Sequence, residues 1–186
     1  MKKKSVVLIF LLLCFFSRTS YADPFRSKIN LFTPGFNFGI GIPKIPISHY
    51  RTPIAICGGI VTYFGITSRF AFQVSANGLY TFNLGSVIQG NNKLKFNLFW
   101  GDICFDYKLK FSLNTDSYIS PGIGYYNLFQ QFDDAKDDLT TFGLTVGLLT
   151  NNYGRKNITQ FEIRWHLLFH PESKPQVLTI KFGFLL

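Results

Sequence analysis

Four ionisable residues near the end of the chain have the types that acid–base chemistry requires. Glu162, Arg164 and His166 alternate along one segment, and Lys181 lies in the next segment. Side chains at alternate positions of a β-strand share one face, so these groups could meet and relay protons. They could instead form an internal salt-bridge network, because buried charges must be paired. The sequence favours the network and predicts no catalytic residue.

The histidines do not predict a metal site. His49 and His170 fall in different loops of the strand pattern described below, and His166 lies in a strand. No cysteine or third ligand with metal-binding spacing accompanies them. The run from Asp133 to Asp138 lacks the ligand spacing and turn glycine of a calcium loop, which is typical of a solvated charge run. We therefore predict neither a metal nor a cofactor.

One segment has the residue types of a lipid-modifying hydrolase. His170-Pro171-Glu172-Ser173 supplies a histidine, an acid and a serine. A nucleophilic serine needs a base held at hydrogen-bond distance, and a proline-containing loop does not fix that geometry. The enzyme remains an alternative, and the favoured prediction is that the protein is not an enzyme.

These residues lie within a repeated alternation of apolar and polar positions. The last segment, 177–186, has one fully apolar face, formed by Leu178, Ile180, Phe182, Phe184 and Leu186. A period of two indicates β-strands. The same signal predicts strands over about 35–43, 54–64, 70–82, 93–113, 118–129, 139–149, 158–169 and 177–186. In the second of these the two faces do not differ enough to assign an inward side.

The fourth predicted strand changes phase. Leu94, Phe96 and Leu98 form its first apolar set, whereas Ile103 and the alternate residues after it form the second. A slip of one residue predicts a β-bulge between Phe99 and Asp102, with Leu98 facing outward.

Short turns alternate with longer connections along the chain, which is typical of an up-and-down barrel in an outer membrane. Lipid can cover the apolar faces, and closure removes the strand edges. The sequence therefore predicts an all-β fold, an eight-stranded antiparallel up-and-down transmembrane β-barrel. A barrel of this size fills its lumen with side chains.

The first residues predict export. Met1 is followed by three lysines, an apolar run from Val6 to Phe16, and Ser20-Tyr21-Ala22, which is the order of a secretory signal. We assign residues 1–22 to a signal peptide, 23–34 to a periplasmic N-terminal segment and 35–186 to the barrel.

Composition agrees with a membrane barrel. Aromatic residues make up 18% of the chain, with 22 phenylalanines. Tyrosine and tryptophan prefer the headgroup level, so an interfacial girdle is expected; its candidates are Tyr63, Tyr80, Trp100, Tyr107, Tyr118, Tyr125, Tyr126 and Trp165. Cys57 and Cys104 lie on strands that are not neighbours, which favours two buried thiols over a disulfide. No basic run or arginine-rich helix points to nucleic acid.

Three segments resemble small bacterial outer-membrane β-barrels of the opacity-protein and outer-membrane-protein-X type. They are Gly122-Ile123-Gly124-Tyr125-Tyr126, the strand from Phe161 to His166, and the closing run from Leu178 to Leu186. The resemblance covers most of the chain as a pattern rather than as a motif. It implies recognition of the C-terminal strand by the barrel-assembly machinery, although Leu186 replaces the usual terminal aromatic residue.

The sequence thus predicts a monomeric, non-enzymatic outer-membrane component, either structural or a surface contact module. Its lumen would hold Glu162, Arg164, His166 and Lys181, and its partners would be outer-membrane lipid and lipopolysaccharide. Two alternatives remain open: a lipid A deacylase or acyltransferase in the same barrel, and a soluble lipocalin-like binder of an apolar ligand.

Overall fold

A computed structural model describes residues 32–44, 54–67, 69–81, 94–110, 115–132, 135–153, 158–169 and 174–186. Among these residues, no helix is long and apolar enough to cross a membrane.

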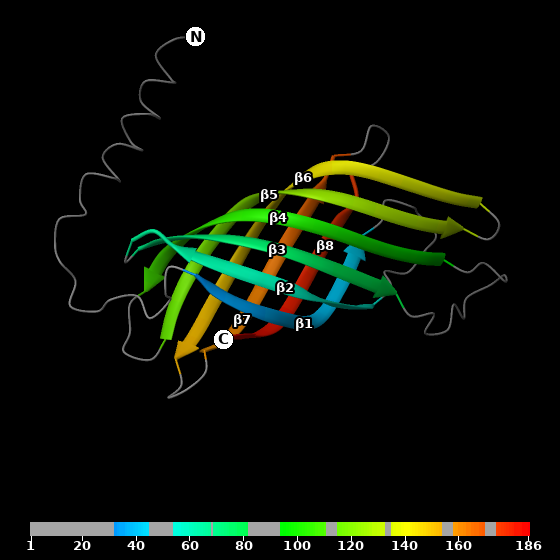
Figure 1. Ribbon diagram of the computed structural model, residues 1–186. Helices are drawn as coiled ribbons and strands as arrows, with labels where there is room; N and C mark the ends of the chain where they lie inside the picture. Colours follow the sequence, from blue (N-terminus) through cyan, green and yellow to red (C-terminus); the bar gives the residue numbers. More distant parts are fainter. Residues whose placement is uncertain are drawn as a thin grey trace, which may run out of the picture.

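The described residues form eight β-strands that run up and down around one closed barrel (Figure 1). They are β1 (Thr33–Lys44), β2 (Ala55–Gly65), β3 (Phe70–Thr81), β4 (Leu94–Lys110), β5 (Thr115–Phe132), β6 (Ala135–Tyr153), β7 (Ile158–Leu168) and β8 (Gln176–Leu185). The predicted fold class is confirmed.

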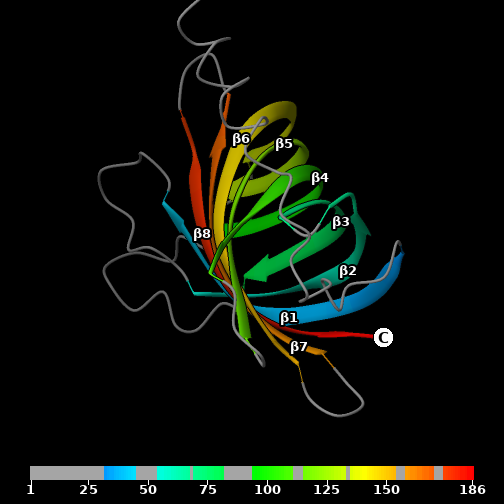
Figure 2. The same ribbon diagram turned by 90° about the vertical axis from the view of Figure 1, so that its left-hand side faces the viewer.

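Each strand pairs antiparallel with the next, and the barrel closes between its first and last strands. The β1–β8 register runs from Gly35 opposite Leu185 to Lys44 opposite Gln176. The start of β1 and the end of β8 therefore lie at the same end of the barrel, which we call the terminal end. Figure 2 shows the strands curling round into this closed wall.

Alternation assigns the two faces of the wall. On β8, Phe182 is 53% exposed whereas its neighbour Lys181 is 1% exposed. The apolar faces predicted for β6, β7 and β8 all point outward, and the polar face of β7 points into the lumen. The outer wall is a continuous belt of exposed leucine, isoleucine, valine and phenylalanine side chains. Strand β2, which the sequence left ambiguous, turns Ile56 and Ile60 outward and Cys57 and Val61 inward.

The predicted bulge in the fourth strand is wrong. The pairing of β4 with β5 is regular from Leu94 to Cys104, and the register shifts only between Lys108 and Lys110. Leu98 is 0% exposed and faces the lumen, where it joins an apolar cluster. The lumen at this level is itself apolar, so an apolar residue such as Leu98 can face inward. In the sequence this gave the false signal of a phase change.

Several strand boundaries also differ from the prediction. Strand β1 begins at Thr33 rather than Gly35. Strand β5 continues to Phe132 and β6 starts at Ala135, so most of the predicted acidic loop belongs to a β-hairpin. Strand β6 pairs with β5 from Ala135, but with β7 only from Gly143 onward. The β5–β6 hairpin therefore extends beyond β7 at the end of the barrel opposite the termini, whereas β4 follows β5 as far as Leu94 opposite Phe132.

Candidate functional site in the barrel lumen

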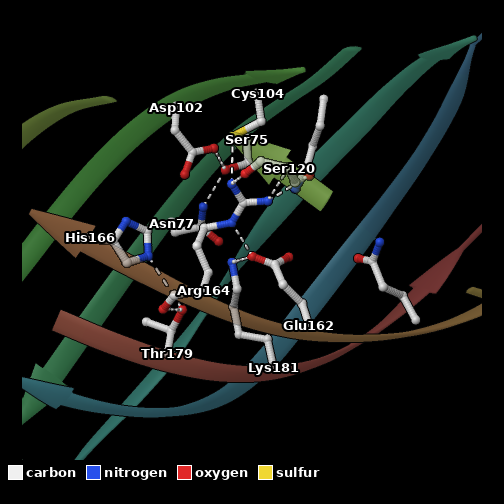
Figure 3. A network of polar contacts seen from close by, with 12 residues as sticks. Ser75, Asn77, Asp102, Cys104, Ser120, Glu162, Arg164, His166, Thr179 and Lys181 are labelled. Carbon is white, nitrogen blue, oxygen red and sulfur yellow. Dashed lines mark hydrogen bonds and ion pairs between the residues drawn. The ribbon is translucent and has the colours of Figure 1, made fainter. Parts of the chain in front are cut away.

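Arg164 lies at the centre of the lumen (Figure 3). Its side chain is 0% exposed. From β7 it crosses the interior and donates through Nη2 to Gln73 Oε1 on β3 at 3.0 Å and to Ser120 Oγ on β5 at 2.9 Å. Its Nη1 lies 2.7 Å from Cys104 Sγ on β4. One planar guanidinium thus joins four strands, a geometry that suits its fixed fork of donors.

A glycine makes room for this guanidinium. A Cβ at Gly147 on β6 would lie 3.1 Å from Cζ of Arg164, closer than ordinary packing allows. The absence of a side chain at this position lets the guanidinium lie against the barrel wall.

Glu162 is the acid that balances the central cations. Its Oε1 accepts a hydrogen bond from Nε of Arg164 and lies 3.2 Å from Nζ of Lys181. Glu162 and Lys181 face each other directly across the β7–β8 pairing. Glu162 is 0% and Lys181 1% exposed, so the charges are held by each other and not by water. Nζ of Lys181 also lies 5.9 Å from the centre of the Trp100 ring.

His166 has different partners from these three ions. Its Nδ1 lies 3.0 Å from the hydroxyl of Tyr126, and its Nε2 lies 3.4 Å from Oγ1 of Thr179. The ring packs edge-to-face on Trp100 at 5.1 Å. The structure therefore brings Glu162, Arg164 and Lys181 together and sets His166 in an adjacent aromatic layer. Thr179 connects the two, because its hydroxyl also donates to the backbone carbonyl of Arg164 at 3.3 Å.

A second polar group stands beside the guanidinium and was not singled out from the sequence. Asp102 on β4 accepts hydrogen bonds from the Ser75 hydroxyl and, at 3.1 Å, from Nε1 of Trp100. Asn77 donates in turn to Ser75. The alternation of Asp102, Cys104 and Asp106 along β4 carried the signal for this group, but Asp102 fell within the predicted bulge, so its face was not assigned.

A third polar group lies nearer the terminal end. Nζ of Lys108 is 2.6 Å from Oδ2 of Asp116, and the hydroxyl of Tyr153 donates to the same oxygen at 2.7 Å. The hydroxyls of Tyr118 and Tyr153 are 3.3 Å apart. Lys108 and Asp116 are each 4% exposed, so this ion pair is buried like the central one.

Two apolar clusters close the interior above and below the central ions. The cluster toward the β5–β6 hairpin comprises Ala55, Cys57, Leu79, Leu98, Trp100, Tyr126, Leu128, Leu168 and Val177. The cluster toward the terminal end comprises Val61, Tyr63, Tyr118, Leu149, Tyr153 and Leu185. The interior is therefore layered, with polar groups packed between apolar ones.

Only some of the residues predicted for the aromatic girdle face outward. Tyr63, Trp100, Tyr118 and Tyr126 are at most 4% exposed and belong to the clusters inside the barrel. Tyr80, Tyr125 and Trp165 do face outward, with exposed fractions of 55%, 48% and 37%. The inward rings fill the lumen and supply hydroxyl and indole groups to the polar layers. Sequence alternation alone does not distinguish such an inward ring from one at the membrane interface.

Of the remaining candidate residues from the sequence, some lie within the described part of the structure and others lie outside it. Cys57 and Cys104 are free and buried, as predicted. His49, and the segment His170 to Ser173 proposed for the enzyme alternative, lie outside the described residues. Within the described part of the chain, no cluster of three or more histidine, cysteine or acidic side chains could hold a metal ion.

The comparisons with known proteins rest on structure alone. No protein-family model and no curated protein matches the sequence. Neisserial surface protein A superimposes with a TM-score of 0.67 at 10% identity, over 84% of this chain and 97% of that one. The attachment invasion locus protein of Yersinia pestis gives 0.52 at 9% identity, over 83% and 97%. A major outer membrane protein of Thermus thermophilus gives 0.50 at 9% identity, over 84% and 98%.

At these identities the likeness establishes the architecture and not a shared activity. The resemblance predicted from the sequence is confirmed at that level: the chain has the fold of the small transmembrane β-barrels of bacterial outer membranes.

Proposed function

We propose that this protein is an integral, monomeric outer-membrane barrel that acts without enzymatic chemistry as a structural component and surface contact module. One observation carries the proposal: the outer wall is a continuous apolar belt, while the lumen is filled by paired charges between two apolar clusters. Lipid is the solvent that such a wall requires.

The lumen supports a structural role for its ions. Glu162 and Arg164 are completely buried, and Glu162 is engaged by both Arg164 and Lys181. A general acid or base must reach a substrate, whereas these groups are directed at one another. A lipocalin-like activity would require an apolar cavity, and charged side chains occupy that space instead.

The β5–β6 hairpin supports a contact role. It extends beyond β7 at the end opposite the termini, which faces the exterior when both termini are periplasmic. Asp138 on this hairpin is exposed. Two proteins with similar folds carry the names surface protein and attachment invasion locus protein. By analogy with these names, the proposal includes a role in attachment for this chain.

Export and assembly complete the proposal. Residues 1–22 would direct the chain across the inner membrane. The exposed apolar face of β8, which includes Phe182 and Phe184, would present the signal that the barrel-assembly machinery reads. Outer-membrane lipid and lipopolysaccharide would then cover the belt.

The orientation can be tested by labelling cysteines at opposite ends of β6. Asp138→Cys and Asn152→Cys both replace exposed residues, whereas the native Cys57 and Cys104 are buried. In intact cells, a membrane-impermeant maleimide should label Asp138→Cys and leave both Asn152→Cys and the unsubstituted protein unlabelled. Permeabilising the outer membrane should then expose Asn152→Cys.

Gel mobility of the outer-membrane fraction before and after boiling provides the control for folding. A folded barrel should migrate differently in the two samples. Labelling of Asn152→Cys in intact cells, or recovery of the protein in the soluble fraction without detergent, would contradict the proposed placement.

A further inference from the structure

The outer wall contains a slot across β3, β4 and β5. It is an open groove of about 400 Å³ on the wall of the barrel, lined by Ala76, Phe99, Gly101, Tyr125 and Asn127 together with parts of Asn77 and Trp100. Ala76 and Gly101 are paired across β3 and β4 and form a floor of small residues. The volume falls in the range of about 300–1,000 Å³ that is usual for small-molecule sites.

Two aromatic rings form the walls of the slot, and each is held on its far side. Phe99 meets Phe129 edge-on at 6.1 Å, and its ring covers Gly78, where a Cβ would lie 3.2 Å away. Tyr125 meets Phe142 edge-on at 5.2 Å. These contacts hold the walls apart, so the slot exists without a ligand to open it.

The end of the slot nearer the hairpin is polar. Asn127 lies directly opposite Phe99 across the β4–β5 pairing. Its Oδ1 accepts a hydrogen bond of 2.7 Å from the hydroxyl of Thr140, which fixes the amide. The nitrogen of that amide keeps two hydrogens that can be donated to an oxygen acceptor. The slot is thus apolar along its floor and walls and has hydrogen-bond donors at one end.

From this polarity we infer that the slot binds one acyl chain of lipid A, with the amide of Asn127 donating to the carbonyl oxygen at the head of the chain. The hydrocarbon of the chain lies over Ala76 and Gly101, between the Phe99 and Tyr125 rings. Van der Waals packing of the chain against these side chains provides the affinity, because a chain already in hydrocarbon gains nothing by leaving water, and the hydrogen bond from the amide fixes its depth.

The choice of lipid follows from the position of the slot. Its polar end points toward the β5–β6 hairpin, and in the orientation given under the proposed function this is the outer leaflet. The inference rests on that orientation. The acylated glycolipid that fills this leaflet can enter the slot sideways, with its carbonyl level with Asn127 and its chain directed to the bilayer centre.

Filling the slot provides the test. Ala76→Leu and Gly101→Leu each place a side chain on the floor. Gly101 tolerates a Cβ, whose nearest neighbour beyond the adjoining residues would be the Ser75 carbonyl oxygen at 3.5 Å. Val74→Leu is the matched control, because Val74 is an outward residue of the same strand, 42% exposed and outside the slot. Native mass spectrometry of full-length protein, titrated with purified lipid A in mild detergent, measures the affinity.

The unsubstituted protein and Val74→Leu should retain one lipid A, and both filled variants should bind it about tenfold more weakly. Asn127→Leu should also weaken binding. Equal lipid A affinity in all variants would overturn the inference, as would equal affinity of the unsubstituted protein for phosphatidylglycerol.

Gel mobility before and after boiling is measured for each variant as the control for folding. In one outcome the unsubstituted protein shows the gel shift, and the cysteine variants the labelling expected for the proposed orientation, while lipid A is not retained. That result would refute lipid A binding in the slot and leave the proposed function intact. Loss of the shift in the unsubstituted protein would instead refute the barrel placement.

Discussion

Glu162 holds two buried cations in place. Its Oε1 contacts both Arg164 and Lys181, and all three side chains are at most 1% exposed. Ionised groups removed from water are tolerated only when they are paired. Loss of this carboxylate would therefore leave Arg164 and Lys181 without the acid that contacts both of them.

Replacing Glu162 by glutamine should destabilise the barrel by about 3–5 kcal/mol, because two cations would lose their buried counter-charge. Equilibrium urea unfolding in lipid vesicles measures the change in the free energy of unfolding. Asp138→Asn removes an exposed carboxylate and should alter stability by less than about 0.5 kcal/mol.

The double variant Glu162→Gln with Lys181→Gln checks the mechanism. It should lose less stability than the two single variants together, because the residues are direct partners. Unchanged stability of Glu162→Gln would show that the lumen is hydrated enough to screen these charges.

At the scale of single strands, the two faces meet different solvents. On β5, Ile123 is 62% exposed and lies between Ile103 of β4 and Leu144 of β6, which are also exposed. This row lies in the apolar belt, where bilayer hydrocarbon takes the place that a protein core would otherwise fill.

Ile123→Arg should therefore cost about 2–4 kcal/mol in a bilayer, the usual penalty for arginine near the midplane of a barrel wall. Asp138→Arg, on the hairpin above the belt, should cost at most about 1 kcal/mol. Refolding into vesicles and urea titration compare the two variants. Equal penalties would mean that the belt does not contact hydrocarbon.

The strand elements also show how local patterns mislead. The predicted phase change of β4 rested on Leu94, Phe96 and Leu98 as an outward set, but Leu98 faces inward with 0% exposure. Tyr126 was predicted for the girdle and instead bonds His166 inside the lumen. In both cases the inward face is partly apolar, so the contrast between faces that reveals a strand's orientation is lost.

For the molecule as a whole, the layered interior argues against a pore. Apolar clusters lie on both sides of the central ions, and one contains Leu98, Leu128 and Leu168, each 0% exposed. A barrel with so few strands is just wide enough for its side chains to fill it.

Purified protein in planar bilayers should accordingly show no stable unitary conductance under applied voltage, whereas an open porin in the same apparatus should conduct. Reproducible current steps from the unsubstituted protein would contradict a closed lumen.

The sequence by itself determined the class of fold and the faces of the best-contrasted strands. On β7 and β8 every outward position except Thr159 and Gln176 is apolar, and inward positions carry Glu162, Arg164, His166 and Lys181. Because the period is two and the two faces differ so clearly in polarity, each of these strands can face only one way in the barrel wall. A slip of one residue would place the charged side chains in lipid.

The tertiary structure decided what the inward residues meet. The register of β7 against β8 places Glu162 opposite Lys181. Closure of the barrel then brings Gln73, Cys104 and Ser120, from β3, β4 and β5, to Arg164. These contacts join strands far apart in the chain, and alternation within one strand carries no information about which neighbours the barrel supplies. The same holds for the lipid-facing slot, which arises only where Ala76, Gly101 and Tyr125 come side by side.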